Sequence, residues 1–276
     1  MTPEEATAEL TGAAVLGARP LSGGAHAVDL GGGGRVVAKE HPRPEAALAE
    51  AASLEWLAVP GGPPVPRVRG VRDRWLVVDL VEAGEPGPRA AEELGRRLAA
   101  LHATGAPAFG APPPGGPERA AIGTAPMANT PHPTWADWFA EHRIARYARL
   151  AVDAGTLTAA EARAVEGVRV AAPEEPPARL HGDLWSGNVV WAADGRAWLI
   201  DPAAHGGHRE SDLAMLALFG CPHLDRVLAA YDEAAPLADG WRARAPLHQL
   251  FPLLVHTVLF GRSYAERALA AARALP

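Results

Sequence analysis

The segment from residue 180 to residue 202 carries three oxygen-bearing side chains at spacings that suit metal and phosphate chemistry. Asp183 precedes Asn188 by five residues, and Asp201 follows Asn188 by thirteen. Carboxylate and amide oxygens are ligands that Mg²⁺ takes together with phosphate and water. Phosphoryl transfer needs such a metal, a carboxylate that orients the accepting hydroxyl, and a cation on the phosphates that stay behind. We therefore expect Asp183 to be the catalytic base, and Asn188 and Asp201 to bind Mg²⁺.

The residues between Asn188 and Asp201 predict a β-hairpin. Val189–Trp191 and Ala197–Ile200 are strand-forming runs on either side of the turn dipeptide Asp194-Gly195. Antiparallel strands bring the two ends of a hairpin together. The two candidate metal ligands should therefore lie side by side.

Each of these side chains also has an ordinary structural explanation, because Asp and Asn favour turns. Three of them bracketing one hairpin favour a functional role. The interval between Asp183 and Asn188 is also the one between the base and the metal-binding Asn of the protein-kinase catalytic loop. The chain holds only two asparagines, Asn129 and Asn188, which adds weight to a role for the second. His181 is expected to brace this loop rather than to do chemistry.

Lysine is nearly absent from the chain: the 26 basic residues are 25 arginines and Lys39. A compact ammonium contacts phosphate as a point charge, unlike the planar fork of arginine. The run Val36–Lys39 resembles the strand motif that presents a lysine to the α and β phosphates, although a lysine on a surface strand is the plain alternative. Three acids follow on the next predicted helix. Glu50 lies mid-helix and is expected to pair with Lys39, whereas Glu45 and Glu55 are expected to face solvent.

Two further segments could contact a nucleotide. The turn Leu21–His26 lacks the three spaced glycines of the protein-kinase loop and is not a Walker A sequence, so a plain hairpin turn is the alternative. Its backbone amides could nevertheless cover phosphates. The residues concerned are Ser22, Gly23 and Gly24. At the end of a predicted strand, the backbone of Val78, Asp79 and Leu80 is placed to hydrogen-bond adenine.

Composition excludes several other classes of function. The formal net charge of −6 offers no basic surface for nucleic acid, and we expect no such partner. The N-terminal residues are acidic where a signal peptide would be basic, and no apolar run reaches the length of a membrane span, so we expect a cytoplasmic protein without a membrane partner. One cysteine, Cys221, excludes an internal disulfide and is expected to be a small buried side chain.

The order of predicted elements indicates an α+β protein with two lobes. Residues 1–82 alternate strand-like runs with turns around one helix, from Pro44 to about Ala58, and residues 83–276 are mainly helical. In the second part, helices are expected at 90–103, over roughly 134–170 and from Arg209 onward, with a Pro-rich break at 173–177. Eight prolines and five glycines between Gly105 and Pro133 predict a long loop, because they sustain neither a helix nor a central strand.

Three sequence segments resemble the fructosamine/ketosamine-3-kinase family, a branch of the aminoglycoside-phosphotransferase-like kinases with a protein-kinase-like fold. They are His181–Asn188, Ile200–Ala203 and Gly207–Met215, and the similarity extends over nearly the whole chain. Asp183-Leu184-Trp185 and Asp201-Pro202-Ala203 distinguish this family from the aminoglycoside and choline kinases.

The resemblance implies ATP-dependent phosphorylation, with Mg²⁺, of the 3-hydroxyl of a ketoamine or other glycated amine, in a bilobal fold that binds the nucleotide between its lobes. By the family pattern, Asp183 matches the base and Asp212 the acid that supports the catalytic loop. Trp185 matches an aromatic residue of the substrate pocket, although a core Trp is the alternative. His205 stands where many relatives have an aromatic residue, and it is assigned to the acceptor pocket.

The sequence departs from the family in two places and leaves other functions open. The nucleotide loop lacks the cysteine that links two subunits in some lineages, so we expect a monomer or weak homodimer. The Pro-rich segment 105–133 is hard to align and is expected to shape the acceptor pocket around Asn129 or Trp135. An aminoglycoside-, choline- or sugar-type phosphotransferase is the alternative of the same fold, and an inactive nucleotide-binding scaffold is the alternative from another class.

Overall fold

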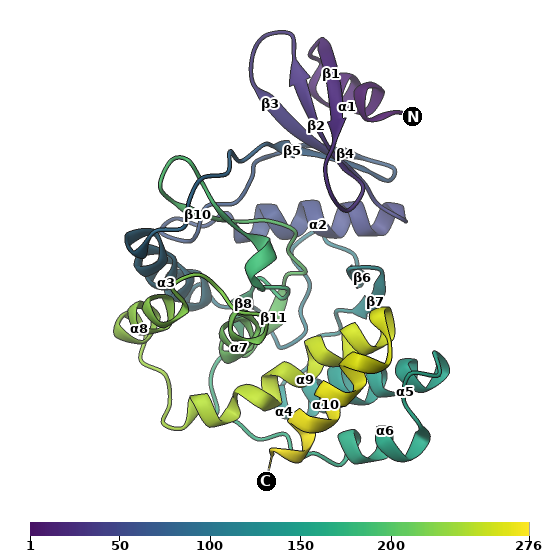
Figure 1. Cartoon of the computed structure of the whole chain (residues 1–276), viewed down its shortest axis with the longest axis vertical. Coiled ribbons are helices and arrows are strands. Elements are labelled where there is room, and N and C mark those ends of the chain that lie inside the picture. Colours follow the sequence, from purple (N-terminus) through teal and green to yellow (C-terminus); the bar gives the residue numbers. More distant parts are fainter. Residues whose placement is uncertain (276) are drawn as a thin grey trace.

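A five-stranded antiparallel sheet forms the N-terminal part of the protein, and its strand order is β1-β2-β3-β5-β4 (Figure 1). The computed structural model describes residues 1–275, so residue 276, the last of the predicted second lobe, lies outside the described residues. The hairpin predicted to carry Lys39 is confirmed as the pair β2–β3, in which Ala25 faces Lys39. The strands are β1 (Val15–Pro20), β2 (Ala25–Leu30), β3 (Arg35–Glu40), β4 (Val68–Arg72) and β5 (Trp75–Asp79).

Two helices cover this sheet, one on each face. Side chains alternate between faces along a strand, and on β5 Trp75 and Val77 pack with Ala6 of α1 (Pro3–Thr11), whereas Leu76 packs with Leu54 of α2 (Pro44–Leu57). The prediction of α2 is confirmed. The prediction of a single helix here is wrong, because α1 was missed although Thr2 and Glu5 form the capping box that announces it.

The rest of the chain is mainly helical, as predicted, and the expected break at 173–177 is confirmed. The division at residue 82 stays a prediction. The helices are α3 (Pro88–Ala103), α4 (Trp135–Trp138), the π-helix η1 (Phe139–Ala145), α5 (Arg146–Asp153), α6 (Ala159–Glu166), the 3-10 helix η2 (Ser186–Asn188), α7 (Glu210–Leu218), α8 (Leu224–Ala234), α9 (Trp241–Phe260) and α10 (Arg262–Arg273). No helix among residues 1–275 has both the length and the apolar character needed to cross a membrane.

Three two-stranded sheets lie among these helices. The predicted hairpin around Asp194 is confirmed as β9–β10, in which Leu199 faces Val189. The remaining pairs are β8–β11 and β6–β7. The strands are β6 (Arg119–Ile122), β7 (Ala125–Ala128), β8 (Ala178–Leu180), β9 (Val189–Trp191), β10 (Ala197–Leu199) and β11 (His205–Gly207).

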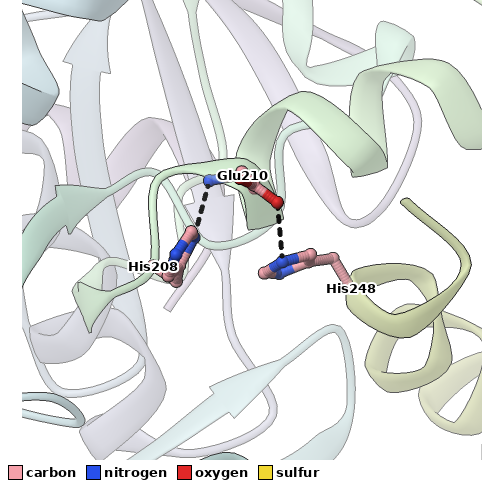
Figure 2. A group of neighbouring side chains, drawn as sticks. All are labelled: His208, Glu210 and His248. Carbon is pink, nitrogen blue, oxygen red and sulfur yellow. Dashed lines mark hydrogen bonds and ion pairs between the residues drawn. The ribbon is translucent and has the colours of Figure 1, made fainter. Parts of the chain in front are cut away.

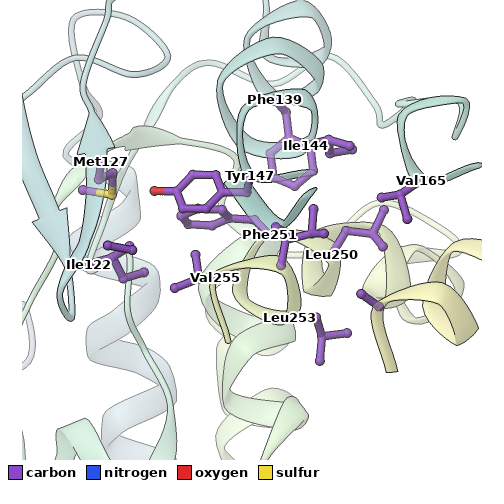
Figure 3. Close-up of a cluster of buried hydrophobic side chains, with 14 of the residues drawn as sticks. Ile122, Met127, Phe139, Ile144, Tyr147, Val165, Leu250, Phe251, Leu253 and Val255 are labelled. Atoms are coloured by element: carbon purple, nitrogen blue, oxygen red, sulfur yellow. The ribbon is translucent and has the colours of Figure 1, made fainter. Parts of the chain in front are cut away.

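The β6–β7 hairpin corrects the prediction of an unbroken loop over residues 105–133. Its two strands pair only with each other. Pro126, which lacks a backbone N–H, therefore does not break the hydrogen bonding of a larger sheet. Ile122 and Met127 point into the largest core cluster beside Tyr147 and Phe251 (Figure 3). The Tyr147 hydroxyl donates a hydrogen bond to the Pro126 carbonyl oxygen, at 2.9 Å. Tertiary packing thus holds strands that the Pro and Gly content disfavours.

A buried group of polar side chains fixes the start of α7 against α9 (Figure 2). The Nε2 atom of His248 lies 3.3 Å from Oε2 of Glu210, and the Glu210 amide donates to Nδ1 of His208, at 3.3 Å. These three residues have the chemistry of metal ligands. Both oxygens of Glu210 already accept hydrogen bonds from Arg244, however, which neutralises the carboxylate. We therefore interpret the group as an ion-pair network that anchors α7.

Glu210→Gln is expected to lower the free energy of unfolding at pH 7 by about 2–4 kcal/mol, because it leaves a largely buried guanidinium without its carboxylate. Burial alone would raise the pKa of Glu210, but its contacts with His248 and Arg244 hold the pKa at about 2. An unfolded Glu titrates near pH 4.3. The stabilisation is therefore complete above about pH 5 and is lost as the pH falls toward 2.

Urea unfolding of wild type and variant across pH 2–7 measures this effect. Glu92→Gln is the matched control, because Glu92 pairs with Arg226 on the surface and such pairs contribute less than about 1 kcal/mol. Equal losses in the two variants, or a difference that does not shrink in acid, would contradict the prediction.

Candidate active site

A cavity of about 370 Å³ brings seven of the fifteen predicted site residues together. Its walls come from the β3 end, from α2, from the Pro-rich segment with the β6–β7 hairpin, and from residues 183–204. The predicted site residues that line it are Gly23, Lys39, Glu50, Asp183, Trp185, Asn188 and Asp201. Residues far apart in the sequence therefore converge on one space.

Lys39 lies at the centre of an ion-pair triad. Its Nζ atom is 2.7 Å from Oε2 of Glu50 and 3.0 Å from Oδ1 of Asp201. The triad joins β3, α2 and the segment after β10. Burial alone would lower the pKa of Lys39, but the two carboxylates outweigh burial and raise the pKa, so the ammonium stays charged. The predicted pairing of Lys39 with Glu50 is present in the structure.

Asp183 and Asn188 face each other across one turn of the loop. The Asn188 Nδ2 atom donates to the Asp183 carbonyl oxygen at 2.8 Å and to its Oδ2 atom at 3.1 Å. Because these contacts use the amide nitrogen, Oδ1 of Asn188 remains available as an oxygen ligand. Burial raises the pKa of Asp183 to about 7. A carboxylate with such a pKa suits proton transfer near neutral pH.

Asp201 lies beside Asn188, as the hairpin predicted. The Ile200 amide donates to the Asn188 carbonyl oxygen, at 3.0 Å. Asp201 has a φ of 52°, in the left-handed region that costs a non-glycine residue energy. Its side chain is 48% exposed at the cavity. The strained backbone thus delivers a carboxylate to the open space next to the second oxygen ligand.

Asp212 of α7 holds the backbone of the loop that carries Asp183. Its carboxylate accepts hydrogen bonds from the backbone amides of His181 (2.8 Å) and Gly182 (3.0 Å), and it contacts Nε2 of His102 at 3.1 Å. Burial alone would raise the pKa of Asp212, but these contacts reverse the effect and lower it. His181 is fully buried, with Nε2 3.0 Å from the Ile200 carbonyl oxygen, which fits the predicted bracing role.

Gly182 is required where the loop passes the segment after β10. Its φ is 82°, and a Cβ atom there would lie 2.1 Å from the Ala203 carbonyl oxygen. A side chain would therefore displace the backbone on which Asp183 stands.

The residues predicted to bind the nucleotide are only partly at the cavity. Ser22, Gly23 and Gly24 form the turn between β1 and β2, and of the three only Gly23 lines the cavity. Val78, Asp79 and Leu80 lie at the end of β5 and do not line it. The amides of Asp79 and Leu80 already donate to the carbonyl oxygens of Arg67 and Arg35. Neither amide is therefore free to hydrogen-bond adenine in this conformation.

Of the two residues predicted to contact the acceptor substrate, Trp185 lines the cavity and His205 does not. The Trp185 side chain is 39% exposed at the cavity, and it packs over the backbone of Gly187 and edge-to-face against Phe219, with ring centroids 6.1 Å apart. His205 does not line the cavity. Its ring packs against Trp138 (5.4 Å), and Nδ1 lies 2.9 Å from the Ala203 carbonyl oxygen. Burial lowers the pKa of His205 to about 3, so His205 is a neutral core residue rather than an acceptor contact.

The wall made by the Pro-rich segment was predicted only in outline. Its cavity-lining members include Pro113, Pro117, Thr124 and Asn129. The rarity of asparagine was the sequence signal that pointed to Asn129. The prolines gave no signal for individual positions, only a high count over the segment. The predicted alternative, Trp135, is buried beside Phe139 and His248 and does not line the cavity.

Comparisons with known proteins show the family to which the chain belongs. The family model described as fructosamine kinase matches residues 35–275. A probable ketoamine kinase of Thermus thermophilus is 36% identical over 239 residues, covering 84% of each chain, and one of Escherichia coli is 36% identical over 220 residues, covering 77% of this chain and 74% of that one.

Solved structures give the same answer for the fold. The crystal structure of a putative fructosamine-3-kinase from Thermobifida fusca superposes with a TM-score of 0.90 at 48% identity, covering 98% of this chain and 97% of the other. A thermostable aminoglycoside phosphotransferase, at 19% identity and a TM-score of 0.58 over 98% of both chains, supports the fold alone. The predicted α+β, protein-kinase-like fold is confirmed, and the chain belongs to the fructosamine kinase family of phosphotransferases.

Proposed function

We propose that this protein transfers the γ-phosphate of ATP to the 3-hydroxyl of a fructosamine or related ketosamine, a step in the repair of glycated amines. The observation that carries the proposal is the convergence of the Lys39–Glu50 pair, Asp183, Asn188 and Asp201 on one cavity. Family membership supports ATP as the donor. The cavity holds a candidate base, two candidate metal ligands and a cation for the phosphates, which argues against an inactive scaffold.

Asp183 is assigned as the base. It orients the acceptor hydroxyl, whose oxygen attacks the γ-phosphorus while the bond to the β,γ-bridging oxygen breaks. The hydroxyl proton passes to the Asp183 carboxylate, and ADP leaves. Lys39, kept charged by Glu50 and Asp201, would hold the phosphates that are not transferred.

The oxygen atoms of Asn188 and Asp201 fit Mg²⁺, because Asn188 turns its nitrogen toward Asp183 and Asp201 is exposed at the cavity. Bound there, the ion would neutralise phosphate charge. Trp185 would stack on the acceptor sugar, since it is the exposed aromatic residue next to Asp183. Gly23 would cover the phosphates. We still propose that the backbone near Val78–Leu80 contacts adenine. Backbone groups other than the amides of Asp79 and Leu80 would make these contacts, because those two amides already donate hydrogen bonds.

The cavity suits a neutral or singly charged acceptor better than a polycationic aminoglycoside. Glu50 and Asp201 both pair with Lys39, Asp201 is also assigned to Mg²⁺, and Asp183 is assigned to proton transfer. This leaves Glu40 as the lining carboxylate without an assigned role, and it pairs with Arg74. A small glycated amine needs no further acids.

We further propose a cytoplasmic monomer or weak homodimer with no nucleic-acid or membrane partner. The acidic net charge and the single cysteine support this. Burial raises the pKa of Cys221 to about 11, so its thiol stays protonated and unreactive.

With Mg-ATP, the purified protein should release ADP in the presence of fructosamines or ribulosamines, and the phosphate should appear on the 3-hydroxyl. A coupled ADP assay with an acceptor panel that also holds an aminoglycoside and choline measures the preference, and ³¹P–¹H NMR of the product locates the phosphate. Turnover restricted to the aminoglycoside or choline would replace the proposed acceptor class.

Asp183→Asn is expected to lower kcat by about 10²–10⁴-fold, the usual contribution of a positioned acid–base group. ATP binding should survive, because the amide keeps the side-chain volume. Asp194→Asn is the matched control, since Asp194 pairs with Arg196 at the exposed hairpin turn. Full ketosamine turnover by Asp183→Asn would remove this residue from the mechanism.

Lys39→Arg is expected to keep the charge but lower kcat/KM by about 100-fold, because the wider fork cannot satisfy both carboxylates and the phosphates in the same space. The reverse exchange on the same strand, Arg35→Lys, should change kcat/KM little, since Arg35 forms a surface pair with Glu82. Steady-state kinetics with ATP as the varied substrate compares the two. Normal kinetics of Lys39→Arg would show that any cation suffices there.

A further inference from the structure

Asn129 is a buried side chain of the cavity wall to which the proposed chemistry gives no role. It follows β7 directly, is 1% exposed, and lines the same cavity as Asp183 and Trp185. Its backbone amide donates to the Glu118 carbonyl oxygen at 2.9 Å, which ties it to the base of the hairpin. The other asparagine of the chain, Asn188, lines this cavity as well.

Arg143 of η1 fixes how the Asn129 amide is turned. This arginine is 0% exposed, and its Nη2 atom donates to Oδ1 of Asn129 at 3.3 Å, while Nη1 donates to the Ala128 carbonyl oxygen at 3.0 Å. Because a guanidinium can only donate, the oxygen of the Asn129 amide must face it and the nitrogen must face elsewhere. The orientation of the amide is therefore set by chemistry.

Arg143 itself is held in an aromatic setting. Its guanidinium carbon lies 4.3 Å from the Trp138 ring centroid and 5.0 Å from that of Phe251. Among residues 1–275, no carboxylate lies within ion-pair distance of it. An uncompensated buried charge polarises the amide that it contacts, which strengthens the amide N–H as a donor.

The Asn129 Nδ2 atom has no hydrogen-bond partner among the residues that the structure describes, although it is buried. Leaving a buried donor unsatisfied costs about 1–3 kcal/mol. A donor fixed at a cavity wall in this way favours a ligand that brings an acceptor oxygen.

We propose that Asn129 is a binding residue for the acceptor substrate: Nδ2 donates a hydrogen bond to an uncharged oxygen, a hydroxyl or carbonyl, of the sugar part of the ketosamine. Arg143 is the positioning residue that holds the amide in this orientation. This inference rests on the proposed function, and it names a contact that selects oxygen-rich acceptors. Such a contact gives strong selectivity, because an analogue that lacks the oxygen would leave the buried Nδ2 donor without a partner.

Asn129→Ala and Asn129→Asp test the contact together. Asp keeps the volume and can pair with Arg143, so it is expected to fold, but it cannot donate at neutral pH. Both variants should raise the KM for the ketosamine by about 10–100-fold, while the KM for ATP changes less than threefold. Thr130→Ala is the control, because Thr130 is the exposed neighbour on the same segment. Arg143→Lys should give a ketosamine KM between those of wild type and Asn129→Ala, because an ammonium orients the Asn129 amide less well than the guanidinium does.

A set of deoxy-ketosamines identifies the oxygen. Wild type should bind one of these analogues more weakly than the parent ketosamine, because that analogue lacks the oxygen that Asn129 contacts. For this analogue alone, wild type and Asn129→Ala should have the same affinity, because neither pair can form the hydrogen bond. Binding to the Asp183→Asn protein, measured by calorimetry with and without Asn129→Ala, gives a readout that needs no turnover.

The outcomes separate this inference from the proposed function. If wild type phosphorylates ketosamines and both Asn129 variants keep the wild-type KM, or lose affinity equally for every analogue, Asn129 is structural and the inference is wrong. If wild type phosphorylates no ketosamine, the proposed function is wrong, and this inference is overturned with it.

Discussion

A buried carboxylate, Asp212, sets the constraint on which the catalytic loop depends. A buried charge must be compensated, and Asp212 obtains compensation from the amides of His181 and Gly182 and from His102 of α3. The loop backbone is therefore held by a helix rather than by its own turn. Because α7 also carries Glu210, whose ion pairs with Arg244 fix the helix to α9, the position of Asp183 follows from the packing of the helical core. The raised pKa of Asp183 has the same origin, since the packing that holds the loop also removes water from it.

The Lys39 triad applies the same principle between the sheet and the helical part. One ammonium contacts carboxylates from α2 and from the segment after β10, so three separate pieces of chain must meet for these ion pairs to form. Such a partly buried arrangement contributes little net stability, because desolvation offsets the Coulomb attraction. What it provides is position. Asp201 is held with a left-handed backbone at the cavity mouth, and the cost of that conformation is met by contacts that exist only in the assembled fold.

Local patterns predicted much of this structure, and tertiary contacts decided the rest. The β2–β3 and β9–β10 hairpins, α2 and α3 follow from spacing and turn residues, and the pairing of Lys39 with Glu50 follows from a kinase-like strand motif and a mid-helix acid. The β6–β7 hairpin could not be predicted, because its strands exist through packing on Tyr147 and Phe251 against an unfavourable composition. His205 was assigned to the acceptor pocket because many relatives have an aromatic residue at this position, yet its Nδ1 atom turns back to the Ala203 carbonyl oxygen and its ring packs in the core. Which way a side chain faces on such a short strand depends on neighbours that lie far away in sequence.

Rare residue types were informative here for a physical reason. In a chain that uses arginine for 25 of 26 basic residues, Lys39 occupies a place where a compact ammonium meets two carboxylates. Among residues 1–275, Asn188 donates from its amide nitrogen to Asp183 and keeps its oxygen free, and Asn129 accepts from Arg143 with its oxygen and keeps its nitrogen free. A carboxylate, which only accepts, cannot replace either amide. Rarity alone does not indicate catalysis, however. The single glutamine, Gln249, donates from Nε2 to the Ala214 carbonyl oxygen and so joins α9 to α7. A rare side chain marks a position with a demanding geometry, and the cavity decides whether that geometry serves the chemistry or the fold.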